Sequence, residues 1–242
     1  TPSKLFKLNL QYYKYFLLTC LLSLLIGFFV TTKYSIKITN KYEIGVDEVG
    51  RGPLFGRVYT AAVVLPKDLD SSEIKDSKRF TSEKKLKRVY NYIKDYALYY
   101  SIDYVNEGLI DKINIREATF LSMKKSINHI LTMMKYDFNS KIAILIDGND
   151  FSGMHYYHNH QIRSVPTHLV KKGDALYYSI AAASILAKVA RDEYIYALCK
   201  ENIELDNCYH LSKNKGYGTK QHRDGIKEYG LSKYHRKSFK IK

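Results

Sequence analysis

Four acidic residues of this sequence are candidates for catalysis or metal binding. Asp47 and Glu48 are adjacent and precede a glycine-rich stretch that contains Arg51. Asp147 ends a continuous apolar run of strand length, and Asp174 opens a long helical stretch. Taken singly, an Asp before a helix is commonly an N-cap and an Asp before Gly is commonly a turn residue. Ligands of open α/β sheets gather at strand ends, so the ends of these three segments are expected to converge at one edge of a sheet.

Converging carboxylates require a cation. Like charges repel and raise one another's pKa unless a positive charge neutralises them. Hard oxygen ligands of this kind suit Mg²⁺ or Mn²⁺. The four acids together therefore predict a divalent-metal site.

The elements that must position these acids alternate from residue 41 onward. Short β-branched or aromatic runs predict strands at 42–46, 57–66, 98–105 and 141–148. Stretches without a helix breaker predict helices at 81–97, 116–134 and 174–200. One face of the second helix carries a stripe that is expected to be core, namely Phe120, Met123, Ile127, Ile130 and Met134. The pattern predicts a mixed α/β domain with a central sheet and no internal repeats.

Composition limits the classes of function. The 242 residues are 45% apolar with only four prolines, which is typical of a chain with a sizeable core and excludes a disordered tail. The net charge of +15 predicts a polyanionic partner, nucleic acid or an anionic membrane, and a solvated basic surface is the alternative. Cys20, Cys199 and Cys208 form no C-x-x-C pair, which indicates a reduced, intracellular protein.

The first forty residues differ from the rest and are expected to lie outside the fold. Residues 15–32 contain 18 residues without a charge, enough for a helix of about 27 Å that could cross a bilayer. The segment is interpreted as a membrane anchor, a secretory signal, or a piece foreign to the domain, since the numbering starts at Thr1. It holds five lysines and no acid, so +10 of the +15 remains on 41–242. The predicted organisation is an apolar, basic extension at 1–40 and one domain at 41–242.

Five ordered blocks of the chain resemble type 2 ribonuclease H, the bacterial-type ribonuclease HII. They are "GVDEVGRGPLFG", "DSKRF", "LIDGN", "KKGDALYYSIAAASILAKVARDEY" and "NKGYGTKQHRDGIKEYG" with "YHRKSF", and they span 42–239. The resemblance implies a ribonuclease H-like α/β fold, with a central mixed sheet flanked by helices and a C-terminal helical part. It also implies an endonuclease that cuts the RNA strand of RNA–DNA hybrids and incises at single ribonucleotides in duplex DNA, leaving 5′-phosphate and 3′-hydroxyl ends.

The resemblance further implies a set of catalytic and metal-binding residues: Asp47, Glu48, Asp147 and Asp174. They would hold two divalent cations, Mg²⁺ or Mn²⁺. One cation would lower the pKa of the attacking water, and the other would stabilise the leaving 3′ oxygen.

Substrate-binding roles are implied in the same way. Gly50, Arg51 and Gly52 match the family's ribose-sensing loop, in which glycines let the backbone approach the nucleic acid. Tyr217 matches the tyrosine that stacks on the sugar and detects the 2′-hydroxyl at the RNA-to-DNA junction. Further matches line the duplex channel or, alternatively, are ordinary surface residues of the helix: Lys78, Ser184, Lys188 and Arg191. His235 and Arg236 either pack inside the protein or touch substrate.

One segment departs from the family pattern. Residues 149–172 are longer than the usual link, and His155, His158 and His160 lie within them. Zinc is disfavoured because no cysteine lies nearby, and an exposed polar loop is expected instead.

Alternatives to a type 2 enzyme are a type 3 ribonuclease H and a non-catalytic nucleic-acid-binding relative. The expected partners are RNA–DNA hybrid and ribonucleotide-containing duplex DNA, for a cytoplasmic monomer located with the cell's DNA. Membrane contact through 1–40 is left open.

Overall fold

The computed structural model describes residues 42–75 and 77–241. The expected extension at 1–40, with its apolar stretch, lies outside the described residues. Within the described part, no helix is both long and apolar enough to span a membrane.

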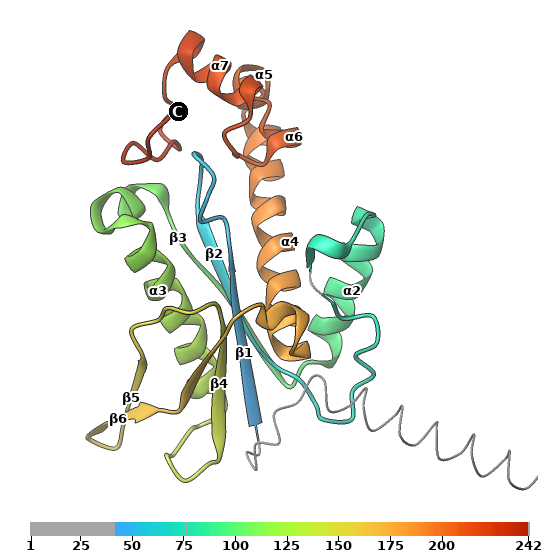
Figure 1. Ribbon diagram of the computed structural model, residues 1–242, viewed down its shortest axis with the longest axis vertical. Helices are drawn as coiled ribbons and strands as arrows, with labels where there is room; N and C mark the ends of the chain where they lie inside the picture. Colours follow the sequence, from blue (N-terminus) through green and yellow to red (C-terminus); the bar gives the residue numbers. More distant parts are fainter. Residues whose placement is uncertain (1–41, 76, 242) are drawn as a thin grey trace, which may run out of the picture. The chain divides into compact units, whose positions relative to one another are not determined.

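A five-stranded mixed sheet forms the centre of the domain, with the strand order β3-β2-β1-β4-β7 (Figure 1). Strand β1 runs antiparallel to β2, and β2 runs antiparallel to β3. On the other side of β1, strands β4 and β7 follow in parallel. The prediction of a central mixed sheet is confirmed. The strands are β1 (Tyr42–Val49), β2 (Val58–Val64), β3 (Tyr99–Val105), β4 (Ile142–Asp147) and β7 (Thr167–Val170).

Helices cover both faces of this sheet (Figure 1). Alternate side chains of β2 point to opposite faces, as strand geometry requires. Ala62 belongs to the cluster that includes α3, and Ala61 belongs to the cluster that includes α2 and α4. The helical segments are η1 (Ser77–Arg79), α2 (Glu83–Tyr96), α3 (Glu107–Met133), η2 (Gly173–Ala175), α4 (Tyr178–Glu201), α5 (Ile203–Tyr209), α6 (Leu211–Asn214) and α7 (Lys220–Tyr229).

Helix α3 begins earlier than predicted and has a break. Its N-cap is Asn106, and Asn114 interrupts it with a φ of 65°. The Asn114 side chain accepts hydrogen bonds from the backbone N–H groups of Arg116, at 2.9 Å, and Glu117, at 3.1 Å. Asn114 therefore caps a second helical segment, whose start agrees with the predicted start near residue 116.

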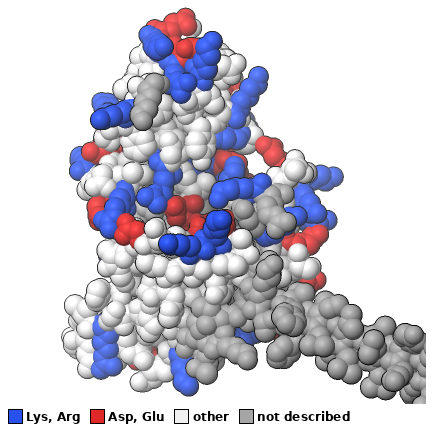
Figure 2. Space-filling model, in the orientation of Figure 1, with Lys and Arg blue, Asp and Glu red and all other residues white. Residues whose placement is uncertain are grey.

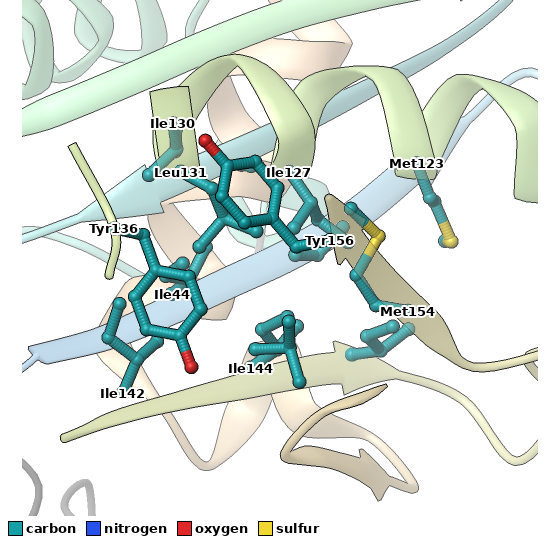
Figure 3. Packing of buried hydrophobic residues seen from close by; sticks show 14 of the residues in the cluster. Ile44, Met123, Ile127, Ile130, Leu131, Tyr136, Ile142, Ile144, Met154 and Tyr156 are labelled. Atoms are coloured by element: carbon teal, nitrogen blue, oxygen red, sulfur yellow. The ribbon is translucent and has the colours of Figure 1, made fainter. Parts of the chain in front are cut away.

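The largest buried cluster lies between α3, β1, β4 and a small hairpin (Figure 3). It confirms the stripe predicted for α3: four of its members are buried, and Met134 packs against them partly buried. Strand β4 contributes Ile142, Ile144 and Ile146 to this face, while Leu145 is also fully buried. A continuous apolar strand of this kind is covered on both sides, as the sequence predicts.

The link at 149–172 is not an exposed polar loop, and that prediction is wrong. It forms the hairpin of β5 (Met154–His158) and β6 (Gln161–Val165) and then the edge strand β7. Met154, Tyr156 and Val165 are buried in the core cluster. Their alternation with exposed polar residues is a strand signal that the histidines of this segment obscured.

Beyond α4, helices α5 to α7 form the C-terminal helical part (Figure 1). A separate apolar cluster holds it to the loop between β1 and β2. Its buried members include Phe55 from that loop, Ile195 from α4, Leu205 from α5 and Ile226 from α7. The C-terminal part is thereby packed against the glycine-rich stretch that follows Asp47 and Glu48.

Candidate active site

The register of the parallel strands brings two of the predicted acids together. Val46 of β1 lies opposite Ile146 of β4, so the next residue of each strand, Asp47 and Asp147, ends side by side. The short helix η2 brings Asp174 to the same strand ends. Carboxylate oxygens of the three acids lie within 4.8 Å of one another. This group is called the acidic triad below.

Backbone and hydroxyl groups hold the triad in place. Gly173 donates its backbone N–H to Oδ1 of Asp147 at 2.6 Å, which ties η2 to the end of β4. Ser184 of α4 donates a side-chain hydrogen bond to Asp47. Ser77 lies 3.0 Å from Ser184, oxygen to oxygen, and because the Ser184 proton is directed to Asp47, Ser77 is the donor of this second bond.

Glu48 lies beside the triad but is not part of it. Its carboxylate faces Arg51, with 3.5 Å between Oε1 and Nη1. The structure thus brings three of the four predicted acids into one group and pairs the fourth with the arginine of the glycine stretch.

Electrostatics make this site one that needs a cation. Burial raises the pKa of Asp47 well above its ordinary value, and the negative charges of Glu48 and Asp147 raise it further. Burial also raises the pKa of Glu48, against the lowering effect of Arg51. Asp47 and Asp174 are only 5% and 6% exposed, so water can screen their charges only weakly. The clustered carboxylate oxygens, together with the raised pKa values of Asp47 and Glu48, fit a hard divalent cation, which would relieve the repulsion.

A lysine also reaches the triad from outside. Lys78 of η1 has its ammonium 3.5 Å from Oδ2 of Asp174, and the side chain itself is exposed. On the face drawn in Figure 2, Lys and Arg side chains lie around small groups of Asp and Glu side chains. A surface of this kind is suited to a polyanion whose phosphates approach bound cations.

The glycine stretch lies next to the loop between α6 and α7 that carries Tyr217, which is called the tyrosine loop below. A Cβ at Gly52 would come 3.6 Å from Cε1 of Tyr217, and Leu54 donates its N–H to the carbonyl of Gly216 at 2.9 Å. The Tyr217 ring is 48% exposed, and Arg51 and Gly52 are exposed beside it. Of the residues predicted to read the ribose, Arg51, Gly52 and Tyr217 therefore share one surface, whereas Gly50 is buried.

Two buried arginines support the glycine stretch from behind. Arg236 is 2% exposed and donates to the carbonyls of Gly50, at 2.7 Å, Pro53, at 2.8 Å, and Gly56, at 2.8 Å. Burial, and then the charge of Arg191, lower the pKa of Arg236 to about 9, so its guanidinium remains charged at neutral pH. Of the two roles left open for Arg236, packing agrees with this geometry.

Arg191 requires a correction, because it was predicted to contact phosphate and it is only 1% exposed. Its guanidinium donates to the carbonyls of Phe55 at 3.1 Å, Arg57 at 3.2 Å and Lys215 at 2.9 Å. Gly50 has a φ of 93°, and a Cβ there would lie 2.4 Å from Nε of Arg191. Arg191 therefore joins the glycine stretch to the tyrosine loop from inside the protein.

The other predicted channel residues differ in position. Ser184 is 6% exposed and is bonded to Asp47, so its position suits the support of an acid rather than contact with phosphate. Lys188 is partly exposed and is ion-paired with Asp192 one turn along α4. Spacing along a helix predicted one common face, whereas α4 is buried on almost all sides between Ser179 and Ala187.

Three supporting groups were missed by sequence reasoning. The Gly173 N–H and the Ser77 hydroxyl lie inside recognised blocks, next to residues that were singled out. His222 was not singled out and is fully buried, with its Nδ1 2.9 Å from the carbonyl of Tyr217. A histidine in a run of charged helix residues carries no sequence signal for such a contact.

A mixed sheet with a triad of carboxylates at its strand ends, flanked by helices and by a basic surface, defines a nuclease of the ribonuclease H type. The family model for ribonuclease HII matches residues 44–242. The ribonuclease HII of Parabacteroides distasonis is 40% identical over 203 residues, which cover 84% of this chain and 92% of the relative. The chain belongs to the ribonuclease HII family and is a ribonuclease H endonuclease, so the two alternative classes are not favoured.

Solved structures agree on the fold. The ribonuclease H2 of Pyrococcus horikoshii OT3 matches with a TM-score of 0.62 and 21% identity, over 83% of this chain and 94% of that one. A Bst-RNase HIII in complex with Mn²⁺ matches with a TM-score of 0.61 and 18% identity, over 84% and 68%. The ribonuclease H-like fold predicted from the sequence is confirmed.

Proposed function

We propose that this endonuclease uses two divalent cations, Mg²⁺ or Mn²⁺, held by Asp47, Glu48, Asp147 and Asp174. The observation that carries the proposal is the acidic triad, whose oxygens lie within 4.8 Å of one another. Bound there, the cations would activate a water for attack on a phosphodiester and stabilise the leaving 3′ oxygen. The Mn²⁺ in the Bst-RNase HIII structure supports this choice of cation by analogy.

The protein's own groups orient these acids. Gly173 fixes one oxygen of Asp147, and Ser184 fixes Asp47 with the help of Ser77. Lys78, 3.5 Å from Asp174, is suited to a substrate phosphate at the edge of the triad. Such pre-orientation leaves the carboxylates little freedom to lose when the cations and substrate bind.

We also propose that the substrates are RNA–DNA hybrids and duplex DNA with single embedded ribonucleotides. Gly50, Arg51 and Gly52 would approach the ribose through the backbone, and Tyr217 would stack on the sugar at the junction. The proximity of the Tyr217 ring to Gly52 and its exposure support this assignment. The 2′-hydroxyl is the group by which a protein can tell RNA from DNA at one position.

A comparison of two substrates tests the proposal. A duplex DNA with one ribonucleotide and a long RNA–DNA hybrid are incubated with the protein and Mg²⁺ or Mn²⁺, and the product ends are mapped. Cleavage of both, leaving 5′-phosphate and 3′-hydroxyl ends, is expected. Cleavage of the hybrid alone would contradict the junction-reading role and favour type 3 behaviour.

The domain that carries this activity is proposed to be 41–242. All described core and site residues lie within it, and the family model starts at residue 44. No role in catalysis is assigned to 1–40.

A further inference from the structure

Two buried histidines connect the tyrosine loop to the segment that follows α7. Nε2 of His222, on α7, lies 3.1 Å from Nε2 of His235, and the rings are 0% and 1% exposed. At its other nitrogen, His222 contacts the carbonyl of Tyr217 at 2.9 Å. At its other nitrogen, His235 meets both the backbone N–H of Ser232, at 2.9 Å, and the Ser232 hydroxyl, at 2.8 Å.

The two ends of this chain of contacts define the positions of the protons. A backbone N–H can only donate, so Nδ1 of His235 accepts from Ser232 and its Nε2 carries the proton; the Ser232 hydroxyl then also donates to Nδ1. A carbonyl can only accept, so Nδ1 of His222 carries a proton and its Nε2 accepts. Both ends give the same direction: Ser232 to His235, His235 to His222, and His222 to Tyr217. The neutral pair satisfies every ring nitrogen, and a further proton would break one of these bonds.

The surroundings keep the pair neutral. The Tyr209 ring of α5 lies 4.7 Å from the His235 ring, centroid to centroid, and its hydroxyl donates to the carbonyl of Gly230. The apolar Phe55 ring lies perpendicular to the His235 ring, 5.1 Å from it between centroids. The two nearby cations are turned elsewhere: Arg223 donates to the carbonyl of Gly218, and Arg236 donates into the glycine stretch. Among the described residues, no carboxylate forms an ion pair with either ring.

Burial lowers the pKa of His222, and it lowers that of His235 to about 4, with a further lowering from His222. The neutral pair agrees with the direction of the hydrogen bonds.

We propose that His222 and His235 are positioning residues for Tyr217, holding its carbonyl so that its exposed ring stands at the ribose beside Gly52. The carbonyl of Tyr217 also accepts from the N–H of Thr219 at 2.7 Å, so its backbone is fixed from two sides while the ring stays free. This inference rests on the junction-reading role proposed for Tyr217. In this account the preference for the junction depends on a buried histidine pair that positions Tyr217 without contacting the substrate or a metal.

Two matched variants of His222 separate its hydrogen bond to Tyr217 from its hydrogen bond to His235. In His222→Asn the side-chain amide lies near the former Nδ1, so it can still donate to Tyr217 but cannot reach His235. In His222→Gln the amide lies near the former Nε2, so the bond to His235 is kept and the one to Tyr217 is lost. Both replace a buried ring by a smaller amide, so both lose packing of a similar kind.

The measurement is kcat/KM for the single-ribonucleotide duplex divided by kcat/KM for the long hybrid. We expect His222→Gln to lower this ratio about fivefold, as the loss of one hydrogen bond implies, and His222→Asn to stay near wild type. Adding Tyr217→Ala to His222→Gln is expected to give no lower ratio than Tyr217→Ala alone. Equal ratios for the two His222 variants, or additive losses in the double variant, would overturn the inference.

The failure of the underlying proposal looks different. If Tyr217→Ala leaves the ratio unchanged, Tyr217 is not a junction reader, and the positioning role falls with it. If Tyr217→Ala lowers the ratio and His222→Gln does not, only the positioning role is overturned. A nitrogen-15 NMR spectrum of the wild-type protein at pH 7 supplies an independent check. Protons on Nδ1 of His222 and Nε2 of His235 are expected. The opposite tautomers would refute the proposed direction of the hydrogen bonds.

Discussion

Gly173 and Asp147 are joined by a hydrogen bond of 2.6 Å between the glycine N–H and Oδ1 of the carboxylate, across 26 residues of chain. This bond brings the turn that carries Asp174 to the end of β4. A side chain at position 173 would force its neighbours to shift, because its Cβ would lie 2.5 Å from Cδ1 of Ile180 and 3.3 Å from the bonded oxygen of Asp147. The spacing between two acids that we propose to bind metal therefore depends on a residue without a ligand side chain.

Gly173→Ala is expected to weaken metal binding by about tenfold, since a displaced hydrogen bond to a charged group is worth about 1.5 to 3 kcal/mol. Titration of Mn²⁺ by calorimetry measures the loss. The control is Gly173→Ala combined with Ile180→Val, which removes the Cδ1 atom that the new methyl would strike. Partial recovery of affinity is expected, and equal affinity in wild type and Gly173→Ala would show that the close approach is not needed.

Tyr217→Ala removes a stacking surface worth about 1 to 3 kcal/mol, by analogy with base–aromatic stacking. The loss is expected to fall hardest on the single-ribonucleotide duplex, where one 2′-hydroxyl positions the scissile phosphate, and less on a long hybrid with many registers. Arg51→Ala should shift preference in the same direction. Ratios of kcat/KM for the two substrates check this, with metal affinity titrated separately. An equal decline of kcat/KM on both substrates, or a parallel fall in metal affinity, would show that these residues do not read the junction.

Acid should destabilise the protein through its histidine pair. In the folded state the pKa of His235 is about 4 against an ordinary 6.5, and that of His222 is also lowered. The unfolded chain therefore binds more protons between pH 6.5 and 4, so the free energy of unfolding falls as the pH drops through this window. The loss from His235 is about 3 kcal/mol and is nearly complete below pH 4. Urea unfolding at several pH values is expected to give a shallower pH dependence in His235→Gln than in wild type. The same slope in both would contradict a neutral buried pair.

The sequence predicted where two of the acids lie better than it predicted the groups that hold the site in place. Asp47 and Asp147 could be placed together because parallel strands end at one edge, and the register of Val46 with Ile146 meets that expectation. Glu48 was grouped with Asp47 by its adjacency, although adjacent strand residues point to opposite faces and the structure leaves Glu48 outside the triad. Its pairing with Arg51 depends on the path of the glycine stretch, which has no regular period.

Long-range supports carried no local signal. Arg236 bonds to carbonyls up to 186 residues away, and spacing along the chain says nothing about such a contact. Arg191 was misread because helical spacing shows which residues share a face but not whether that face is covered. The hairpin at 154–165 was readable in principle from the alternation of Met154 and Tyr156, but tyrosines and histidines made the segment look polar.

The segment before residue 41 is expected to be dispensable for catalysis. A truncated chain that starts at Lys41 should fold and cleave at the wild-type rate, because the core and the site described above lie beyond that point. Circular dichroism and the single-ribonucleotide assay measure the two properties. An unfolded truncation would mean that 1–40 contributes to the stability of the domain.

Single-turnover cleavage of a single-ribonucleotide duplex by Asp147→Asn, with duplex binding followed in parallel, tests the metal assignment most directly. The substitution removes one negative charge from the acidic triad and almost no volume, and Asp47→Asn serves as its matched partner at the other strand end. Both variants are expected to bind the duplex and to lose cleavage in Mg²⁺ and Mn²⁺. Cleavage at the wild-type rate by either variant in Mg²⁺ would contradict the assignment of these carboxylates to the catalytic metals.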